Sequence, residues 1–410
     1  MSVYEDIRLE GHIIDSLILP RVLDDILDLG GDYQILDISI GRHKNDPSVA
    51  TVRVEAADDR QLAALLDRLQ RHGAQALDQA DARLEPAAAD GVFPEAFYST
   101  TNLETYVRVG GRWVPVLPPE MDCGIVVDLE GPSARTVPLI QVRRGDQVVV
   151  GARGLRVIPL TRPRKARPFE FMSSMVSSEK PKALVIGEVA RLMRETHAAG
   201  RAIIVVAGPA VVHTGAAPAL ARLVREGWID VLFGGNAVAA HDIESAFYGT
   251  SLGVHLREGV PVEGGHEHHL RAINRIRSAG SIAAAVEQGE LAEGLFFELV
   301  RAGTPYVLAG SIRDDGPLPD VLTDVMAAQQ AMREHVSGAG LCLMLSTMLH
   351  SIATGNLLPA SVHTVCVDIN PAVVTKLADR GSFQTIGVVT DIGLFLGQLA
   401  DHLAGPEVLV

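Results

Sequence analysis

The sequence is poor in aromatic residues and in positive charge, and each shortage excludes a class of partner. Aromatic side chains make up 4% of the 410 residues, so the stacking platforms that bind single-stranded nucleic acid are not expected. The formal net charge is -14, which disfavours binding to phosphate backbones or to anionic lipid. We therefore expect a small-molecule substrate, with no nucleic-acid partner and no membrane partner.

Cysteine is rare as well, and targeting signals are missing. Cys123, Cys342 and Cys366 form no Cys-x-x-Cys pair, and an odd, sparse count is typical of the reducing cytosol. Cys342 and Cys366 lie in apolar runs and are expected to be core side chains, whereas Cys123 lies in a loop context and is the one to test for reactivity. The N-terminus MSVYEDIRLEGH lacks the basic and apolar regions of a signal peptide. These features predict a cytoplasmic protein.

The common nucleotide-binding and hydrolase motifs are also absent. The G-x-G of SGAGLCLML precedes a strand-like run instead of following one, and the sequence has no Walker A motif and no G-x-S-x-G elbow. Zinc sites need three or four ligands at defined spacing, and no second Cys/His cluster accompanies HEHH at 266–269. The sequence therefore predicts no metal site and does not by itself show an ordinary dinucleotide fingerprint.

What the sequence does contain is apolar material for more than one core, since 47% of its residues are hydrophobic. Residues 1–98 follow the order strand, helix, strand, strand, helix, strand, which is typical of a ferredoxin-like α+β domain. Residues 99–165 consist of short strands joined by glycine turns, which predicts a β-rich, barrel-like domain. A basic, proline-flanked linker, PRKARP, follows.

From residue 170 to 410, continuous apolar strands alternate with amphipathic helices. This alternation predicts an α/β domain with a doubly wound parallel sheet, whose ligands bind beyond the carboxyl ends of the strands. Glycine lets a ligand approach the backbone, helix N-termini attract phosphate, and an acid at a strand end can bind a ribose. We expect a nucleotide cofactor to be bound by Gly208, Pro209, Gly234, Gly235, Asn236, Gly310, Ser311, Asp314, Ser346, Thr347, Asp368, Asn370, Thr390 and Asp391.

Several stretches resemble a known family. They include PPEMDCGIVV, GGNAVAAHDIE, GHEHHLRAINRIRSAGSI and AGSIRDDGPLPDV, and they are similar to the conserved region of the bifunctional lysine-oxoglutarate reductase/saccharopine dehydrogenase (LOR/SDH). Over essentially its whole length the chain resembles the archaeal-type NAD-dependent ornithine cyclodeaminases and the C-terminal module of arginine dihydrolase–ornithine cyclodeaminase fusions. The resemblance implies a Rossmann-like NAD-binding domain of deoxyhypusine-synthase-like type. It also suggests a homo-oligomer, either a dimer or a tetramer.

The reaction that the resemblance implies converts L-ornithine to L-proline and ammonia by hydride abstraction, cyclisation and re-reduction. Such a site needs a base for the α-ammonium group, and histidine, a buried carboxylate or a desolvated lysine can serve. The catalytic candidates are His266, Glu267, His268, His269, Lys180 and Asp315. Apolar residues at helical spacing follow HEHH, so these histidines should lie at a helix N-terminus, where they could hold a substrate carboxylate.

Other interpretations of the same residues stay open. The HEHH stretch can be read as polar residues that begin a helix, and Asn236 and the Asp314–Asp315 pair as residues that support helix N-termini. At the level of function, the alternatives are another NAD-linked amino-acid dehydrogenase of lysine or saccharopine type, a non-catalytic ligand-sensing regulator, and a zinc hydrolase.

Overall fold

The computed structural model describes residues 3–43, 46–70, 72–77, 80–131, 133–159, 176–177, 182–314, 316–379 and 385–404. It divides into two compact units, one formed by residues 1–172 with 356–361 and the other by residues 173–355 with 362–410. Among the described helices, none is both long enough and apolar enough to cross a membrane.

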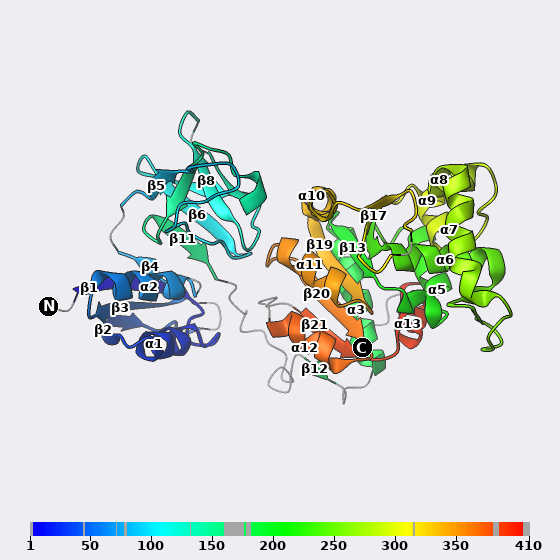
Figure 1. The fold of residues 1–410 in the computed structure, drawn as a ribbon. Coiled ribbons are helices and arrows are strands. Elements are labelled where there is room, and N and C mark those ends of the chain that lie inside the picture. The colour runs from blue at the N-terminus through cyan, green and yellow to red at the C-terminus, as the bar shows by residue number, and fades with distance from the viewer. Residues whose placement is uncertain are drawn as a thin grey trace. The chain divides into compact units, whose positions relative to one another are not determined.

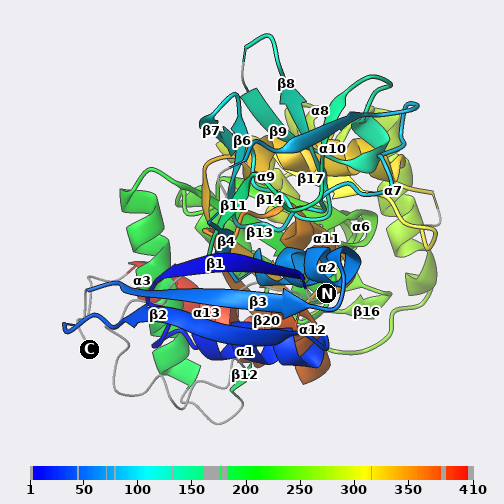
Figure 2. The same ribbon diagram turned by 90° about the vertical axis from the view of Figure 1, so that its left-hand side faces the viewer.

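The first unit begins with a four-stranded antiparallel sheet. Its elements are β1 (Val3–Gly11), α1 (Ile18–Asp28), β2 (Asp32–Ser39), β3 (Ser48–Ala56), α2 (Asp59–Gln70) and β4 (Gln75–Ala76). The strand order is β2-β3-β1-β4, and Figure 2 shows β1, β3 and β2 side by side. Residues alternate along β3 between buried and half-buried, and the buried ones, such as Val52, pack with Val22 of α1 and Leu65 of α2. The order strand, helix, strand, strand, helix, strand is the predicted one.

A mainly antiparallel seven-stranded sheet follows in the same unit. Its strands are β5 (Arg83–Pro86), β6 (Glu104–Val109), β7 (Arg112–Val116), β8 (Gly124–Asp128), β9 (Ser133–Val137), β10 (Gln147–Val150) and β11 (Leu155–Ile158), in the order β11-β6-β7-β9-β8-β10-β5. The Ala82 N–H donates to the Arg108 carbonyl at 2.9 Å, so the start of β5 returns toward β6. We expect the boundary at residue 98, whereas the earlier strand β5 pairs with β10 in this second sheet. Local sequence cannot reveal which sheet so short a strand will join.

The second unit is an α/β domain (Figure 1). Its first half contains β12 (Val176–Ser177), α3 (Lys182–Ala198), β13 (Ala202–Ala207), α4 (Ala210–His213), α5 (Ala217–Arg225), β14 (Val231–Gly235), α6 (Asn236–Tyr248), β15 (Thr250–Ser251), β16 (Val254–His255), α7 (His268–Ala279), α8 (Ile282–Glu287) and α9 (Leu295–Ala302). Its second half contains β17 (Tyr306–Ala309), β18 (Val321–Leu322), α10 (Val325–Val336), β19 (Ala339–Leu345), α11 (Leu349–Leu357), β20 (His363–Asp368), α12 (Pro371–Asp379), β21 (Thr385–Val389) and α13 (Ile392–Ala404).

The eight strands of its main sheet are all parallel, in the order β12-β21-β20-β19-β13-β14-β17-β18. From β13 the chain runs outward through β14 and β17 and then returns to place β19 on the other side of β13. The six strands β17-β14-β13-β19-β20-β21 therefore have the 3-2-1-4-5-6 order of a Rossmann fold. The predicted doubly wound sheet is confirmed, and its switch point lies between β13 and β19.

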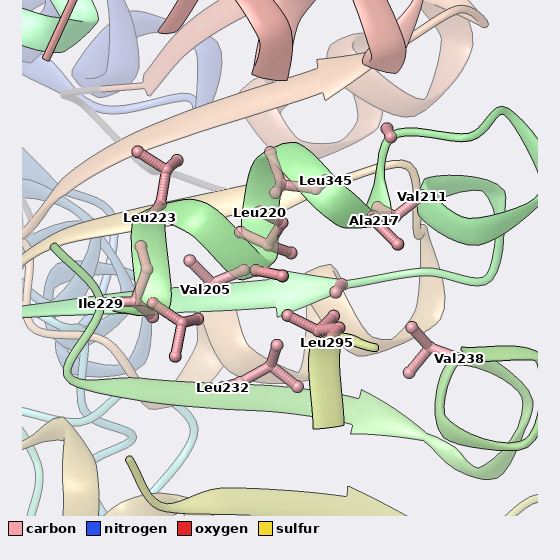
Figure 3. Close-up of a cluster of buried hydrophobic side chains, with 14 of the residues drawn as sticks. Val205, Val211, Ala217, Leu220, Leu223, Ile229, Leu232, Val238, Leu295 and Leu345 are labelled. Carbon is pink, nitrogen blue, oxygen red and sulfur yellow. The ribbon is translucent and has the colours of Figure 1, made fainter. Parts of the chain in front are cut away.

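Both faces of this sheet are buried, which explains the continuous apolar strands in the sequence. Val205 of β13 and Leu232 of β14 pack with Leu220 of α5 and Leu295 of α9 in one core (Figure 3). Val206 points to the opposite face and is equally buried. The strands therefore read as uninterrupted hydrophobic runs, with no polar alternation to mark a solvent face.

A buried carboxylate holds the start of α9. Asp242 of α6 accepts hydrogen bonds from the Leu295 N–H at 3.0 Å and the Phe296 N–H at 2.9 Å. A Cβ atom on Gly294 would lie 2.9 Å from Oδ2 of Asp242, so the carboxylate fits because residue 294 has no side chain. Burial raises the pKa of Asp242 to about 6, although the two backbone hydrogen bonds act in the opposite direction.

This carboxylate should make the stability of the second unit depend on pH. The pKa of Asp242 is about 6 in the folded chain against an ordinary value of 3.8, so the folded state holds the proton more tightly. The bound proton therefore stabilises the folded state by about 3 kcal/mol at most. This contribution is fully present below the ordinary pKa of Asp242 and is lost as the pH rises through 6. In Asp242→Asn this part of the slope should disappear. Urea unfolding between pH 4 and 7, followed by Trp228 fluorescence in a Trp113→Phe background, measures it, and parallel profiles for the two proteins would contradict the assignment.

Candidate functional site

The two loops at the switch point pack directly on each other. The Gly208 N–H, just after β13, donates to the Leu345 carbonyl at the end of β19 at 2.9 Å. A Cβ atom on Gly208 would lie 2.1 Å from the carbonyl oxygen of Ser346, and Ser346 itself has φ 50°. The absence of a side chain at Gly208 therefore allows this contact, and the backbone of both loops is available to a ligand beyond the carboxyl ends.

A histidine from α11 lies over the neighbouring strand ends. The His350 ring is so close to Gly235, the last residue of β14, that a Cβ atom there would lie 2.9 Å from Cε1. His350 also hydrogen-bonds the backbone of Ala309 at the end of β17, and burial lowers its pKa although this bond and Asp314 act in the opposite direction. The chain after β19 thus reaches across to the ends of β14 and β17.

Several predicted cofactor residues have local roles in the fold. The Asn236 Oδ1 accepts from the Leu318 N–H at 3.0 Å, the Asp314 Oδ2 accepts from the Ser311 N–H at 2.8 Å, and the Asp391 Oδ1 accepts from the Leu394 N–H in α13 at 2.9 Å. Asp314 stabilises a turn and Asp391 a helix start, whereas Asn236 joins the start of α6 to the segment before β18.

Asp368 closes β20, and its Oδ1 accepts from the Asn370 N–H at 2.8 Å. The Thr390 N–H, at the end of β21, donates to the backbone carbonyl of Asp368. The predicted residues Asp368, Asn370 and Thr390 therefore lie together at the carboxyl ends of β20 and β21.

A polar network lies among α4, α6 and α7, two of which begin at the carboxyl edge of the sheet. At its centre is Glu244 of α6, which has no exposed side-chain surface. It accepts hydrogen bonds from His241 Nδ1 (2.7 Å), Thr250 Oγ1 (2.8 Å), and the N–H groups of Leu252 (3.3 Å) and Gly253 (3.1 Å). Burial by itself raises the pKa of Glu244, and the hydrogen bonds lower it. The hydrogen bonds have the larger effect together, so the pKa of Glu244 lies below its ordinary value.

Further histidines surround this carboxylate. Thr250 Oγ1 lies 2.8 Å from His268 Nδ1, and Tyr248 stacks on the His268 ring at 4.6 Å. His213 of α4 contacts His241 edge-on at 4.8 Å, and its Nδ1 lies 2.7 Å from the hydroxyl of Ser251. Burial and the neighbouring His241 lower the pKa of His213 to about 4, so this imidazole is uncharged at neutral pH.

The HEHH stretch divides between this network and solvent. His268 lies in the network, and the His269 ring is 6.0 Å from that of His241. The side chain of His266 is 83% exposed, and Glu267, also exposed, is paired with Arg271 on the outer surface of α7. The structure thus does not bring His266 and Glu267 into the network. Lys180 and Asp315 lie outside the described residues.

The paired glycines before HEHH have a packing role. A Cβ atom on Gly265 would lie 2.6 Å from the carbonyl oxygen of Gly253, and one on Gly253 would lie 2.7 Å from the backbone of Gly265. This backbone contact fastens the start of α7 to the turn that carries Thr250. Sequence reasoning missed Glu244, Thr250 and Ser251, and the available signal was the HDIE pattern, which puts His241 and Glu244 on one face of a helix.

A pocket of about 670 Å³ opens beside the network, between α5, α6 and α9. Its lining includes Arg225, Asp242, His255 and Arg257, but none of the predicted cofactor residues. It shares α6 and the segment after it with the network, so the two features border each other without coinciding. Among the described residues, no three His, Cys, Asp or Glu side chains are grouped so as to hold a metal ion.

The cysteines are all buried. Cys123, expected in a loop and proposed for a reactivity test, directly precedes β8 and is 2% exposed. Burial, followed by the charge of Asp368, raises the pKa of Cys366 to about 12, and burial also raises that of Cys342. These two thiols behave as core side chains, as predicted.

Comparison with known proteins agrees with this architecture. Residues 187–399 match the family model described as arginine dihydrolase ArgZ-like, C-terminal, Rossmann fold. Residues 104–186 match the first region of the same C-terminal part, and residues 4–103 match the LOR/SDH bifunctional enzyme conserved region. The chain belongs to the ArgZ-like family.

Relatives in this family extend over nearly the whole chain. The ornithine cyclodeaminase of Methanocaldococcus jannaschii is 54% identical over 97% of this chain and 96% of its own length. That of Methanothermobacter thermautotrophicus is 55% identical over 95% of both chains.

Solved structures of the family show the same fold. The apo structure of the cyanobacterial arginine dihydrolase ArgZ matches with a TM-score of 0.86 and 42% identity, covering 98% of this chain and 58% of that protein. The structure described as the ternary complex of AgrE with ornithine and NAD+ matches with a TM-score of 0.53 and 46% identity, covering 98% of this chain and 57% of the other. The chain therefore spans somewhat more than half the length of these two proteins.

Removal of the central carboxylate of the network should destabilise the fold. Glu244→Ala leaves the Gly253 N–H and the Thr250 hydroxyl buried without their acceptor and removes the partner of the Leu252 N–H. We expect a loss of about 3–5 kcal/mol in the free energy of unfolding. Glu287→Ala, at an exposed helix position, is the matched control and should change it by less than about 0.5 kcal/mol. Chemical unfolding of both variants measures the difference, and equal stabilities would be inconsistent with the network as described.

Proposed function

We propose that the chain is an NAD-dependent ornithine cyclodeaminase, which converts L-ornithine to L-proline and ammonia. The observation that carries the proposal is the similarity to archaeal ornithine cyclodeaminases at 54% and 55% identity over 95% or more of both chains. The ternary complex of AgrE with ornithine and NAD+ is a structural relative over 98% of this chain. The Rossmann strand order and its switch point support the same function.

The strand ends suggest how NAD lies on this chain. In a Rossmann unit an acid at the end of the second strand, roughly 20 residues after the first turn, binds the adenosine ribose. In the unit β19-α11-β20, Ser346 lies in the turn after the first strand and Asp368 ends the second strand. We therefore assign the adenosine half to β19 and β20 and the nicotinamide half to β13 and β14. The Gly208–Ser346 contact gives the close backbone approach that a pyrophosphate needs.

The helices after β13 and β14 then supply the chemical groups. α4 carries His213 and α6 carries His241 and Glu244, so the polar network borders the nicotinamide half. When bound, NAD+ supplies the acceptor for a hydride from the α-carbon and returns it after ring closure. The chain's own residues orient the substrate and move its protons, which imidazoles do well near neutral pH. Closure of the ring gains from proximity, since both reacting groups belong to one molecule.

We also propose the wider organisation of the protein. A ferredoxin-like region, a β-rich region and the NAD-binding catalytic region would act as successive domains, with the first change placed between β4 and β5. We propose a cytoplasmic location, which the three buried, unpaired cysteines support. A homo-oligomer is the proposed assembly state.

The proposed reaction has a distinctive stoichiometry. The purified protein with L-ornithine and catalytic NAD+ should form proline and ammonia in equal amounts, with no net NADH, because the hydride is returned. Amino-acid analysis, an ammonia assay and absorbance at 340 nm follow the three species. Stoichiometric NADH with lysine or saccharopine would show a dehydrogenase instead, and binding of ornithine without turnover would show a sensor.

The assigned orientation of NAD predicts the effect of removing Asp368. Asp368→Ala should raise the Kd for NAD+ by about 10- to 100-fold, because a charge-assisted hydrogen bond to the ribose is lost. Asp401→Ala, on the exposed surface of α13, is the matched control and should leave the Kd unchanged. Isothermal titration calorimetry measures both values. An unchanged Kd in Asp368→Ala would remove the adenosine half from β20.

A further inference from the structure

We propose that the single carboxylate of Glu244 sets the tautomers of two histidines, so that His241 and His268 each present an unprotonated Nε2 as a proton acceptor. Glu244 and Thr250 are positioning residues in this arrangement, and the two imidazoles are the groups that meet the substrate. The inference rests on the proposed function, because it assigns the two imidazoles to the two ammonium groups of ornithine.

The first step is that Glu244 can only accept hydrogen bonds. Three donors point at its two oxygens, the Thr250 hydroxyl and the N–H groups of Leu252 and Gly253, and His241 Nδ1 lies within hydrogen-bonding distance. Its pKa ends below the ordinary value because these hydrogen bonds outweigh the effect of burial. The group is therefore ionised at neutral pH, and an ionised carboxylate has no proton to donate.

The second step fixes the tautomer of His241. Its Nδ1 lies 2.7 Å from Glu244 Oε2, and the carboxylate cannot be the donor, so Nδ1 carries the hydrogen. In the neutral ring Nε2 is then the acceptor. A carboxylate orients the histidine of hydrolase triads and of metal sites in the same way.

The third step carries the same constraint to α7 through a hydroxyl. Thr250 has one hydroxyl hydrogen, and it donates to Glu244 Oε1 at 2.8 Å. Its oxygen can therefore only accept from His268 Nδ1, which lies 2.8 Å away. In the neutral ring His268 therefore carries its hydrogen on Nδ1 and leaves Nε2 as the acceptor. The stacked Tyr248 ring, 21° from parallel, keeps the imidazole plane in place.

The groups around the pair include one imidazole that is uncharged at neutral pH. The titratable groups around the pair are Glu244 and Tyr248 of α6, His213 of α4, and Glu267 and His269 at the start of α7. Burial and the neighbouring His241 lower the pKa of His213 to about 4, so that ring adds no positive charge beside His241. Glu244 supplies a buried negative charge to the network.

Two acceptors match the needs of the substrate. Ornithine carries an α-ammonium and a δ-ammonium group, and each must lose a proton, the first before the α-carbon gives up its hydride and the second before nitrogen attacks that carbon. A bond forms between the δ-nitrogen and the α-carbon, and the bond between the α-nitrogen and the α-carbon breaks. The two protons return at the end, one to the departing ammonia and one to the ring nitrogen of proline, so the imidazoles are regenerated.

The tautomers can be measured without any assay of activity. In ¹⁵N-histidine spectra of the whole protein, His241 and His268 should both show Nδ1–H, assigned with His241→Gln and His268→Gln. Thr250→Val, an isosteric change at a fully buried position, should abolish the preference at His268 and leave His241 unchanged. Thr250→Ser keeps the hydroxyl and should restore it. An Nε2–H tautomer at His268 in the wild-type protein would overturn the proposal.

Kinetics test the catalytic consequence. Thr250→Val should lower kcat for proline formation by about 10- to 100-fold with little change in KM for ornithine, and should shift the acidic limb of the pH profile. In a His268→Ala background the same change should cost less than about 2-fold, because the residue that Thr250 positions is gone. Equal losses in both backgrounds would reduce Thr250 to a structural role. If the wild-type protein forms no proline, the proposed function fails and the spectra alone decide the tautomers.

Discussion

The reversal of strand order at β13 is the constraint on which the rest of the candidate site depends. Strands are added on one side of β13 first and on its other side afterwards, so the chain leaves the ends of β13 and β19 in opposite directions and an opening forms there. At the base of this opening Gly208 contacts Ser346, where a side chain on the glycine would overlap a backbone carbonyl. Because α4 and α6 begin at the same edge, their polar side chains lie on one side of this opening. The position of the network follows from the topology.

The second organising feature is the burial of a charge. Taking Glu244 out of water is costly unless its oxygens are satisfied by donors, and the fold provides donors from a helix, a turn and a hydroxyl. That requirement shapes the segment after α6, whose N–H groups at Leu252 and Gly253 turn inward. The contact of Gly253 with Gly265 then fixes the start of α7. A single buried carboxylate thus connects the positions of histidines from two helices.

The comparisons and the geometry support each other from different directions. Identity of 54% to an archaeal ornithine cyclodeaminase extends over the whole fold but does not say which side chains act. The structure separates the residues of the HEHH stretch into an inner pair and an outer pair, and it adds His213, His241 and Glu244. It also gives roles in the fold to Asn236, Asp314 and Asp391, which the strand-end pattern alone had assigned to the cofactor.

The sequence by itself determined the alternation of strands and helices, the parallel sheet and the candidate strand ends, because hydrophobic periodicity and glycine turns are local properties. It could not place β5, since a four-residue strand pairs with a partner some 60 residues away. The sequence also could not show that His266 and Glu267 face solvent while His268 and His269 face the network. The direction of these side chains is decided by the packing of α7 on α6 and by a hydroxyl 18 residues earlier in the chain. Only the tertiary structure brings those groups within hydrogen-bonding distance, and with them the buried charge that orients the histidines.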